Sequence, residues 1–181
     1  MLRFSACDRG SLDYAFSDGS GRSGSIELTR LTRNVTCVAS GAPPVNADFA
    51  LSGHWYDPAT DGQGVTVEIN PLTPVAFFGW YTYAPNGAAA GVAGQRWYTG
   101  QSGYTAGART LAMTLYETRG GLFDAPTTPA PSTLPVGTAT LSFQSCTAAM
   151  LFYSFSGGTN AGASGTINLS RVGPTPPGCS P

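Results

Sequence analysis

Apolar and polar residues alternate in three short stretches near the N-terminus. The alternating apolar residues are Leu2 and Phe4, then Leu12, Tyr14 and Phe16, then Ile26 and Leu28. A two-residue period places one apolar face on a β-strand, and the Gly and Ser residues between the stretches are typical of turns. We therefore predict that residues 2–37 form three antiparallel strands joined by short turns.

The same pattern returns near the C-terminus, where residues 141–179 align with residues 2–37. The matched residues are Leu2, Phe4, Cys7, Leu12, Tyr14, Phe16, Gly24, Ile26, Leu28, Arg30 and Cys37 in the first copy and Leu141, Phe143, Cys146, Leu151, Tyr153, Phe155, Gly165, Ile167, Leu169, Arg171 and Cys179 in the second. We interpret the pattern as an internal repeat whose first copy is partial.

The chain has four cysteines, and they lie at equivalent ends of the two copies. This equivalence favours the pairs Cys7–Cys37 and Cys146–Cys179, with pairing across the copies as the alternative. Each bridge within a copy would contribute about 3–4 kcal/mol in the loop-closure description. An even number of cysteines without a C-x-x-C motif predicts disulfides and an oxidising compartment, so we expect a secreted protein, periplasmic or extracellular.

Between the two copies lie further strand candidates, separated by turn residues. They are 53–56, 64–69, 75–83, 95–100, 110–117 and 137–143, followed by the last two strands of the second copy. The Pro-rich stretch 124–136 is predicted to be one long loop. The pattern predicts an all-β fold of about eight antiparallel strands, either an up-and-down barrel or a two-sheet sandwich. We favour the barrel because closure leaves no free sheet edge.

The domain organisation follows from these elements. We expect a three-strand partial repeat at residues 1–37, a linker at 38–51 and a barrel-like domain at 52–181. Three strands alone are marginally stable. We therefore expect residues 1–37 to pack on the barrel domain or to associate with another chain, including by self-association.

Composition narrows the classes of partner. Charged residues make up 10% of the chain, the net charge is −1 and every basic residue is Arg; globular domains usually have roughly 25% charged residues. The basic surface of a nucleic-acid-binding protein is missing, so we expect no nucleic-acid partner. The sequence also contains no apolar run of the roughly 18 residues that a membrane-spanning helix needs.

One segment carries a family resemblance. Residues 53–65, Gly-His-Trp-Tyr-Asp-Pro-Ala-Thr-Asp-Gly-Gln-Gly-Val, resemble the pattern G-x-W-[YFW]-[DN]-P-x-x-x-G-[QW]-G found in an uncharacterised family of secreted proteobacterial proteins. In that family an aromatic strand like residues 77–83 and a segment like 96–98 follow. The resemblance covers most of residues 52–179. It implies location outside the cytoplasm and a strand-rich architecture, and it implies no particular chemistry.

Few residues are candidates for catalysis or metal binding. His54 is the only histidine, and Asp57 and Asp61 lie four residues apart in the loop 57–63, where Gly62 allows a sharp turn. Two carboxylates at this spacing are candidate ligands for Ca²⁺; the alternative is that both cap backbone N–H groups of the turn. With a metal bound there, His54 and Glu68 would be the catalytic general-base candidates of a metal-dependent hydrolase of a small ester or lactone.

Aromatic residues are dense in the middle strands. The ligand-binding candidates among them are Trp55, Tyr56, Trp80, Tyr81, Trp97 and Tyr98. Inward aromatic residues would fill the barrel, whereas outward or mouth-lining ones offer faces to a sugar ring or an acyl chain. The leading hypothesis is therefore a non-catalytic, exported binding module for a glycan or a small amphiphile. The alternatives are the metal-dependent hydrolase and a structural unit of an extracellular assembly.

Overall fold

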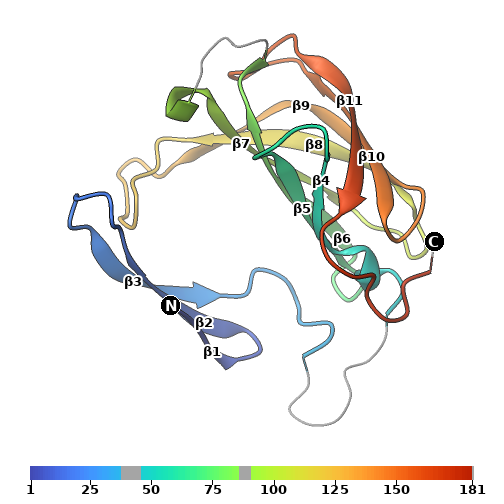
Figure 1. Ribbon diagram of the computed structural model, residues 1–181, viewed down its shortest axis with the longest axis horizontal. Coiled ribbons are helices and arrows are strands. Elements are labelled where there is room, and N and C mark those ends of the chain that lie inside the picture. The colour runs from blue at the N-terminus through green and yellow to red at the C-terminus, as the bar shows by residue number, and fades with distance from the viewer. Residues whose placement is uncertain (38–45, 86–90, 181) are drawn as a thin grey trace. The chain divides into compact units, whose positions relative to one another are not determined.

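A computed structural model describes residues 1–37, 46–85 and 91–180 (Figure 1). The chain divides into two compact units, Met1–Pro44 and Val45–Pro181. Each unit is described by itself.

The second unit is a closed barrel of eight antiparallel strands. The strands are β4 (Gly53–Tyr56), β5 (Gly64–Asn70), β6 (Val75–Tyr83), β7 (Gln95–Gly103), β8 (Thr110–Arg119), β9 (Ser132–Phe143), β10 (Ala148–Phe155) and β11 (Ser164–Arg171). Each strand pairs with the next one along the chain, and β11 returns to pair with β4. The predicted all-β, up-and-down barrel is confirmed.

Side chains fill the middle of the barrel. Phe78, Leu115, Leu141 and Leu151 are fully buried, each on a strand whose alternate residues point outward. Gly100 makes room for one of them, because a Cβ atom at that position would lie 2.4 Å from the Phe78 ring. The barrel interior is therefore a packed core at this level.

One strand begins earlier than the sequence indicated. The Pro-rich stretch 124–136 was predicted to be a loop, but β9 starts at Ser132, so residues 132–136 are strand. Pro135 pairs with Tyr116 beside a register shift in β8. A proline cannot donate a ladder hydrogen bond, and an irregularity of this kind tolerates it.

The end of the predicted linker packs on the barrel. Residues 38–45 lie outside the described residues, but Phe49–Leu51 form a short 3₁₀ helix, η1, in which Leu51 is fully buried. Arg171 of β11 donates hydrogen bonds to the carbonyl oxygens of Ala50 and Ser52, at 2.8 and 2.9 Å. The structured barrel unit therefore begins before residue 52.

The first unit is a three-stranded antiparallel sheet of β1 (Leu2–Ala6), β2 (Arg9–Ala15) and β3 (Ser23–Thr29). A Cys7–Cys37 disulfide spans this unit, and a Cys146–Cys179 disulfide ties the turn between β9 and β10 to the C-terminal segment. The predicted pairing within each copy is confirmed.

Candidate functional site

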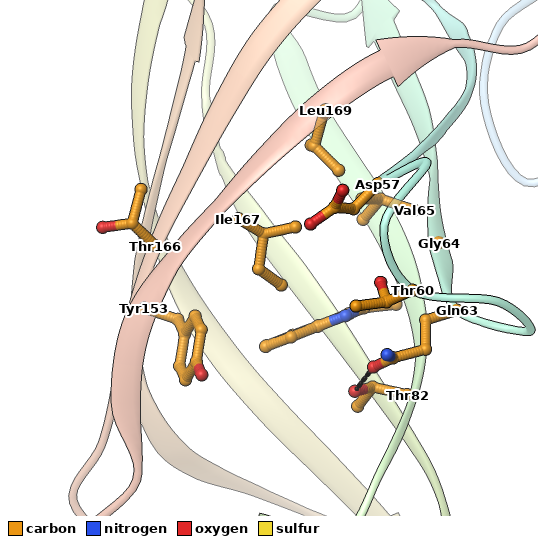
Figure 2. A pocket seen from close by; sticks show the side chains of 11 residues that line it. Asp57, Thr60, Gln63, Gly64, Val65, Thr82, Tyr153, Thr166, Ile167 and Leu169 are labelled. Atoms are coloured by element: carbon orange, nitrogen blue, oxygen red, sulfur yellow. Dashed lines mark hydrogen bonds between the residues drawn. The ribbon is translucent and has the colours of Figure 1, made fainter.

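A side pocket opens where β4 ends. β4 pairs with β11 through only two residue pairs, of which the last joins Tyr56 to Ser170. In the described part of the chain, no strand pairs with residues 164–169 of β11 on that side. The loop 57–63 lies beside them instead, so the barrel wall is interrupted there (Figure 2).

The pocket has a volume of about 250 Å³ and combines apolar, aromatic and polar groups. Its lining residues are Asp57, Thr60, Gln63, Gly64, Val65, Trp80, Thr82, Tyr153, Thr166, Ile167 and Leu169. They come from the loop 57–63 and from β5, β6, β10 and β11. The pocket therefore lies between the loop and β11, with strands from across the barrel behind it.

Aromatic rings form one wall of the pocket. The ring centroids of Trp80 and Tyr153 lie 5.1 Å apart, and Phe155 stacks behind Trp80 at 5.8 Å. Tyr98 packs against Phe155 at 4.6 Å. Because the rings support one another, Trp80 and Tyr153 are held in fixed orientations at the pocket surface.

Polar groups also line the pocket. The carboxylate of Asp57 accepts a hydrogen bond from the backbone N–H of Ala59 at 2.9 Å, which fixes the start of the loop. The Thr82 hydroxyl donates to Oε1 of Gln63 at 2.8 Å, which fixes its end (dashed in Figure 2). Asp57 is the one charged residue in the lining. The pocket thus offers a negative acceptor facing aromatic rings.

A buried carboxylate network lies on the strands behind this aromatic wall. Glu117 of β8 accepts hydrogen bonds from the backbone N–H of Thr159, at 2.8 Å, and from Nε of Arg119. The Tyr98 hydroxyl hydrogen-bonds with the Thr159 hydroxyl at 2.9 Å. Burial opposes ionisation of Glu117, but the hydrogen bonds from Arg119 and Thr159 outweigh it and hold the pKa of Glu117 below its ordinary value. This network joins the β10–β11 turn to β7 and β8.

A second aromatic surface lies on the outside of β6 and β7. Tyr81 and Trp97 are paired across these strands, with 53% and 60% of their surfaces exposed. A Cβ atom at Gly79 would lie 3.6 Å from Nε1 of Trp97 and 3.8 Å from the Tyr81 hydroxyl. Both side chains therefore lie over the bare backbone of Gly79, on the surface of the sheet.

The outer face of β6, β7 and β8 carries no charged residue. Its outward positions are Val75, Phe77, Gly79, Tyr81, Tyr83, Gln95, Trp97, Thr99, Gln101, Gly103, Thr110, Ala112, Thr114, Tyr116 and Thr118. We call these residues the outer aromatic face. It presents rings, hydroxyls and amides, which are groups that hydrogen-bond and stack without requiring a charged partner.

A hollow at the edge of the outer aromatic face adjoins the side pocket. This hollow, of about 330 Å³, is lined by Gly62, Tyr81, Thr82, Tyr83, Gln95, Arg96 and Trp97. Thr82 lines both hollows, and the neighbours Gly62 and Gln63 line one each. A Cβ atom at Gly62 would lie 2.4 Å from the Tyr83 hydroxyl, so the absence of a side chain there lets Tyr83 contact the loop. The loop 57–63 is thus the rim between the two hollows.

The six aromatic ligand-binding candidates separate into three groups. Trp55 and Tyr98 are 1% exposed and belong to the core, where the Trp55 ring packs against Phe143 and beneath the Arg171 guanidinium. Trp80 is 3% exposed and also packs in the core, and part of its surface lines the side pocket. Tyr56, Tyr81 and Trp97 are exposed on the outside of the barrel.

The residues of the hydrolase hypothesis are not gathered in one place. His54 points to the outside of β4, where its Nδ1 lies 3.0 Å from the Thr66 hydroxyl, and Glu68 accepts a hydrogen bond from Asn70. Asp57 lines the side pocket, whereas Asp61 is exposed on the loop. Among residues 1–37, 46–85 and 91–180, no three His, Cys, Asp or Glu side chains form a group that could hold a metal ion.

Several pocket residues were missing from the sequence hypothesis. Tyr153 and Thr82 occupy inward strand positions, and the alternation that predicted the strands had placed such residues in the core. Glu117 left a clearer signal, because it continues the inward series Leu111, Met113 and Leu115 with a charged residue. A charge at a core position indicates a specific partner.

No helix in the described ranges is long and apolar enough to cross a membrane. A scan against protein-family models and searches of curated proteins and of solved structures found no match for this chain.

Proposed function

We propose that the barrel is an exported binding module for uncharged glycans. A sugar ring occupies the side pocket, and the rest of the glycan crosses the rim onto the outer aromatic face. The observation that carries this proposal is the adjacency of the two hollows, which share Thr82 and continue from an aromatic pocket, past Arg96 in the second hollow, to the outer aromatic face.

The chemistry of the pocket suits a sugar ring. The C–H face of a pyranose stacks on an aromatic ring, for which the partly buried Tyr153 is the more accessible one because Trp80 is only 3% exposed, while the sugar hydroxyls donate to a carboxylate such as Asp57. Ligand pockets usually measure about 300–1,000 Å³, so a pocket of about 250 Å³ suits one small ring.

Electrostatics and packing select among ligand classes. Asp57, the one charged group in the pocket, repels anionic glycans such as uronates. The acyl chain of an amphiphile needs an open apolar channel, but the fully buried Phe78, Leu115 and Leu141 fill the middle of the barrel. A neutral glycan therefore fits better than an anionic glycan or a lipid.

Location outside the cytoplasm is part of the proposal. Its support is the pair of disulfides, which persist in oxidising compartments and are rare in the cytosol.

The test is a titration of the purified chain with glycan panels, followed by calorimetry and tryptophan fluorescence. Neutral oligosaccharides of glucose, xylose, mannose and N-acetylglucosamine are compared with oligogalacturonate and with palmitate. We expect one neutral series to bind and the oligogalacturonate and palmitate to fail. A folded protein that binds no neutral series, or that binds only palmitate, contradicts the proposal.

Matched variants locate the site. Asp57→Ala removes an acceptor of charge-assisted hydrogen bonds, each worth roughly 1.5–3 kcal/mol, so we expect affinity to fall at least tenfold. Asp61→Ala, on the exposed part of the same loop, should leave affinity unchanged. Trp97→Ala should weaken binding of long oligosaccharides several-fold, whereas Phe152→Ala, an exposed aromatic residue of β10, should not. Equal effects within either pair would place the ligand elsewhere.

A further inference from the structure

The sheet of the first unit has the strand register of β9, β10 and β11. The pairs Leu2↔Leu12, Leu12↔Ile26 and Tyr14↔Gly24 in the first unit correspond in order to Leu141↔Leu151, Leu151↔Ile167 and Tyr153↔Gly165 in the barrel. A slip of one residue in either strand pair would turn an apolar set to the opposite face. The two triplets therefore present equivalent positions on the same face of the sheet.

The connections of the two triplets also correspond. The backbone N–H of Phe16 donates to Arg22 at 2.9 Å, as that of Phe155 donates to Ala163 at 2.8 Å. At the other end, the N–H of Arg30 donates to Asp8 at 2.8 Å, as that of Arg171 donates to Thr147 at 3.0 Å. Each triplet is also bridged by a disulfide that closes loops of similar length, with sequence separations of 30 and 33 residues.

The corresponding faces differ in burial. Leu141, Phe143, Phe155 and Leu169 of the barrel are at most 6% exposed. Their counterparts in the first unit are exposed instead: Leu2 by 52%, Phe4 by 77%, Phe16 by 47% and Leu28 by 38%. In the barrel, strands β4 to β8 cover this face, with β8 paired to β9 and β4 paired to β11. The barrel thus shows what covers a triplet of this kind.

We propose that β1–β3 is the closing part of a second barrel, whose other five strands have the β4–β8 pattern and are not the β4–β8 strands of the barrel described above. The β4–β8 set in the described residues is already closed by β9–β11. A closed barrel has no free edge to pair with β1 or β3. The partner of β1–β3 is therefore an unclosed five-strand set of this pattern, not an intact barrel.

The barrel also indicates how the partner is recognised. Arg171 lies with its guanidinium 4.5 Å above the Trp55 ring of β4, and Arg30 occupies the corresponding position at the end of β3. The first strand of the partner accordingly carries a Trp at the position of Trp55, which receives Arg30 when the second barrel closes.

The test asks whether β1–β3 can close a five-strand set of the β4–β8 pattern. In a full-length variant, residues 2–37 replace residues 141–179. We expect cooperative unfolding, a buried tryptophan emission spectrum and slow hydrogen exchange in β4–β8, as in the parent chain. Phe4→Asp in the inserted segment should abolish closure, whereas Thr29→Asp, on the other face of β3, should not. An insertion variant with unprotected β4–β8 strands overturns the proposal.

Discussion

Replacing Arg171 tests how the barrel is closed. Its guanidinium donates three hydrogen bonds to backbone carbonyl oxygens: Nε to Cys146 at 2.6 Å, Nη1 to Ser52 at 2.9 Å and Nη2 to Ala50 at 2.8 Å. The same group lies over the Trp55 ring. Arg171→Ala therefore disconnects β11 from η1, from the start of β4 and from the turn before β10.

The expected loss of stability follows from these contacts. A hydrogen bond from a charged donor is worth roughly 1.5–3 kcal/mol, and a cation–π contact adds about 0.5–2 kcal/mol. Desolvation of the cation, which lowers the pKa of Arg171, offsets part of this gain. We expect the free energy of unfolding of the barrel to fall by about 3–5 kcal/mol, which corresponds to about 10–20 °C in Tm. Arg171→Lys should lose most of the stabilisation that Arg171 provides, because an ammonium group cannot reach three diverging carbonyls.

Guanidinium chloride unfolding, followed by tryptophan fluorescence, measures this loss. Arg96→Ala is the matched control, because within the described residues Arg96 bonds only to carbonyls of near neighbours, Ala93 and Gln95, at 2.9 Å. We expect Arg96→Ala to cost less than about 1 kcal/mol. A loss for Arg171→Ala as small as that of the control would refute the reasoning, since the contacts would then only balance the desolvation.

Two further predictions concern buried groups. Because hydrogen bonding, chiefly from Arg119, depresses the pKa of Glu117, its contribution to stability should be complete above pH 4.5 and lost as the pH falls below that value; Glu117→Gln should flatten this acid dependence in urea unfolding, and an unchanged slope would contradict the sign. Gly100→Ala should destabilise the barrel by about 1–3 kcal/mol, because its methyl would lie 2.4 Å from the Phe78 ring. Gly103→Ala on the same strand, with open space around it, should change thermal stability by less than half a kcal/mol.

Strand positions were the most predictable part of this chain. β4 and β6 begin and end where the sequence predicted strands between turn residues. The early start of β9 was missed because prolines in a sequence indicate a loop, and the irregularity that accepts Pro135 depends on a partner strand. The residue pattern of one segment predicts the secondary structure of that segment, whereas a β-bulge depends on how two strands pair.

The candidate site was only partly predictable. In the stretch 77–81 nearly every residue is apolar or aromatic, so alternation cannot decide whether Trp80 or Tyr81 faces inward. The register with β5 and β7 decides it, and that register is a long-range property. The contact between Glu117 and Thr159 joins residues 42 apart in the sequence, which no local spacing encodes.

The early end of β4 has a consequence for which part of a polymer the barrel can hold. A barrel that is open only at its mouth can bind only the end of a polymeric ligand, because a long polymer must enter end-on. The side pocket opens through the wall, between the loop 57–63 and residues 164–169. Under the proposed function, a glycan can therefore approach the side pocket sideways, and an internal sugar unit can bind there while its chain continues in both directions outside the pocket, so binding would not require a free chain end.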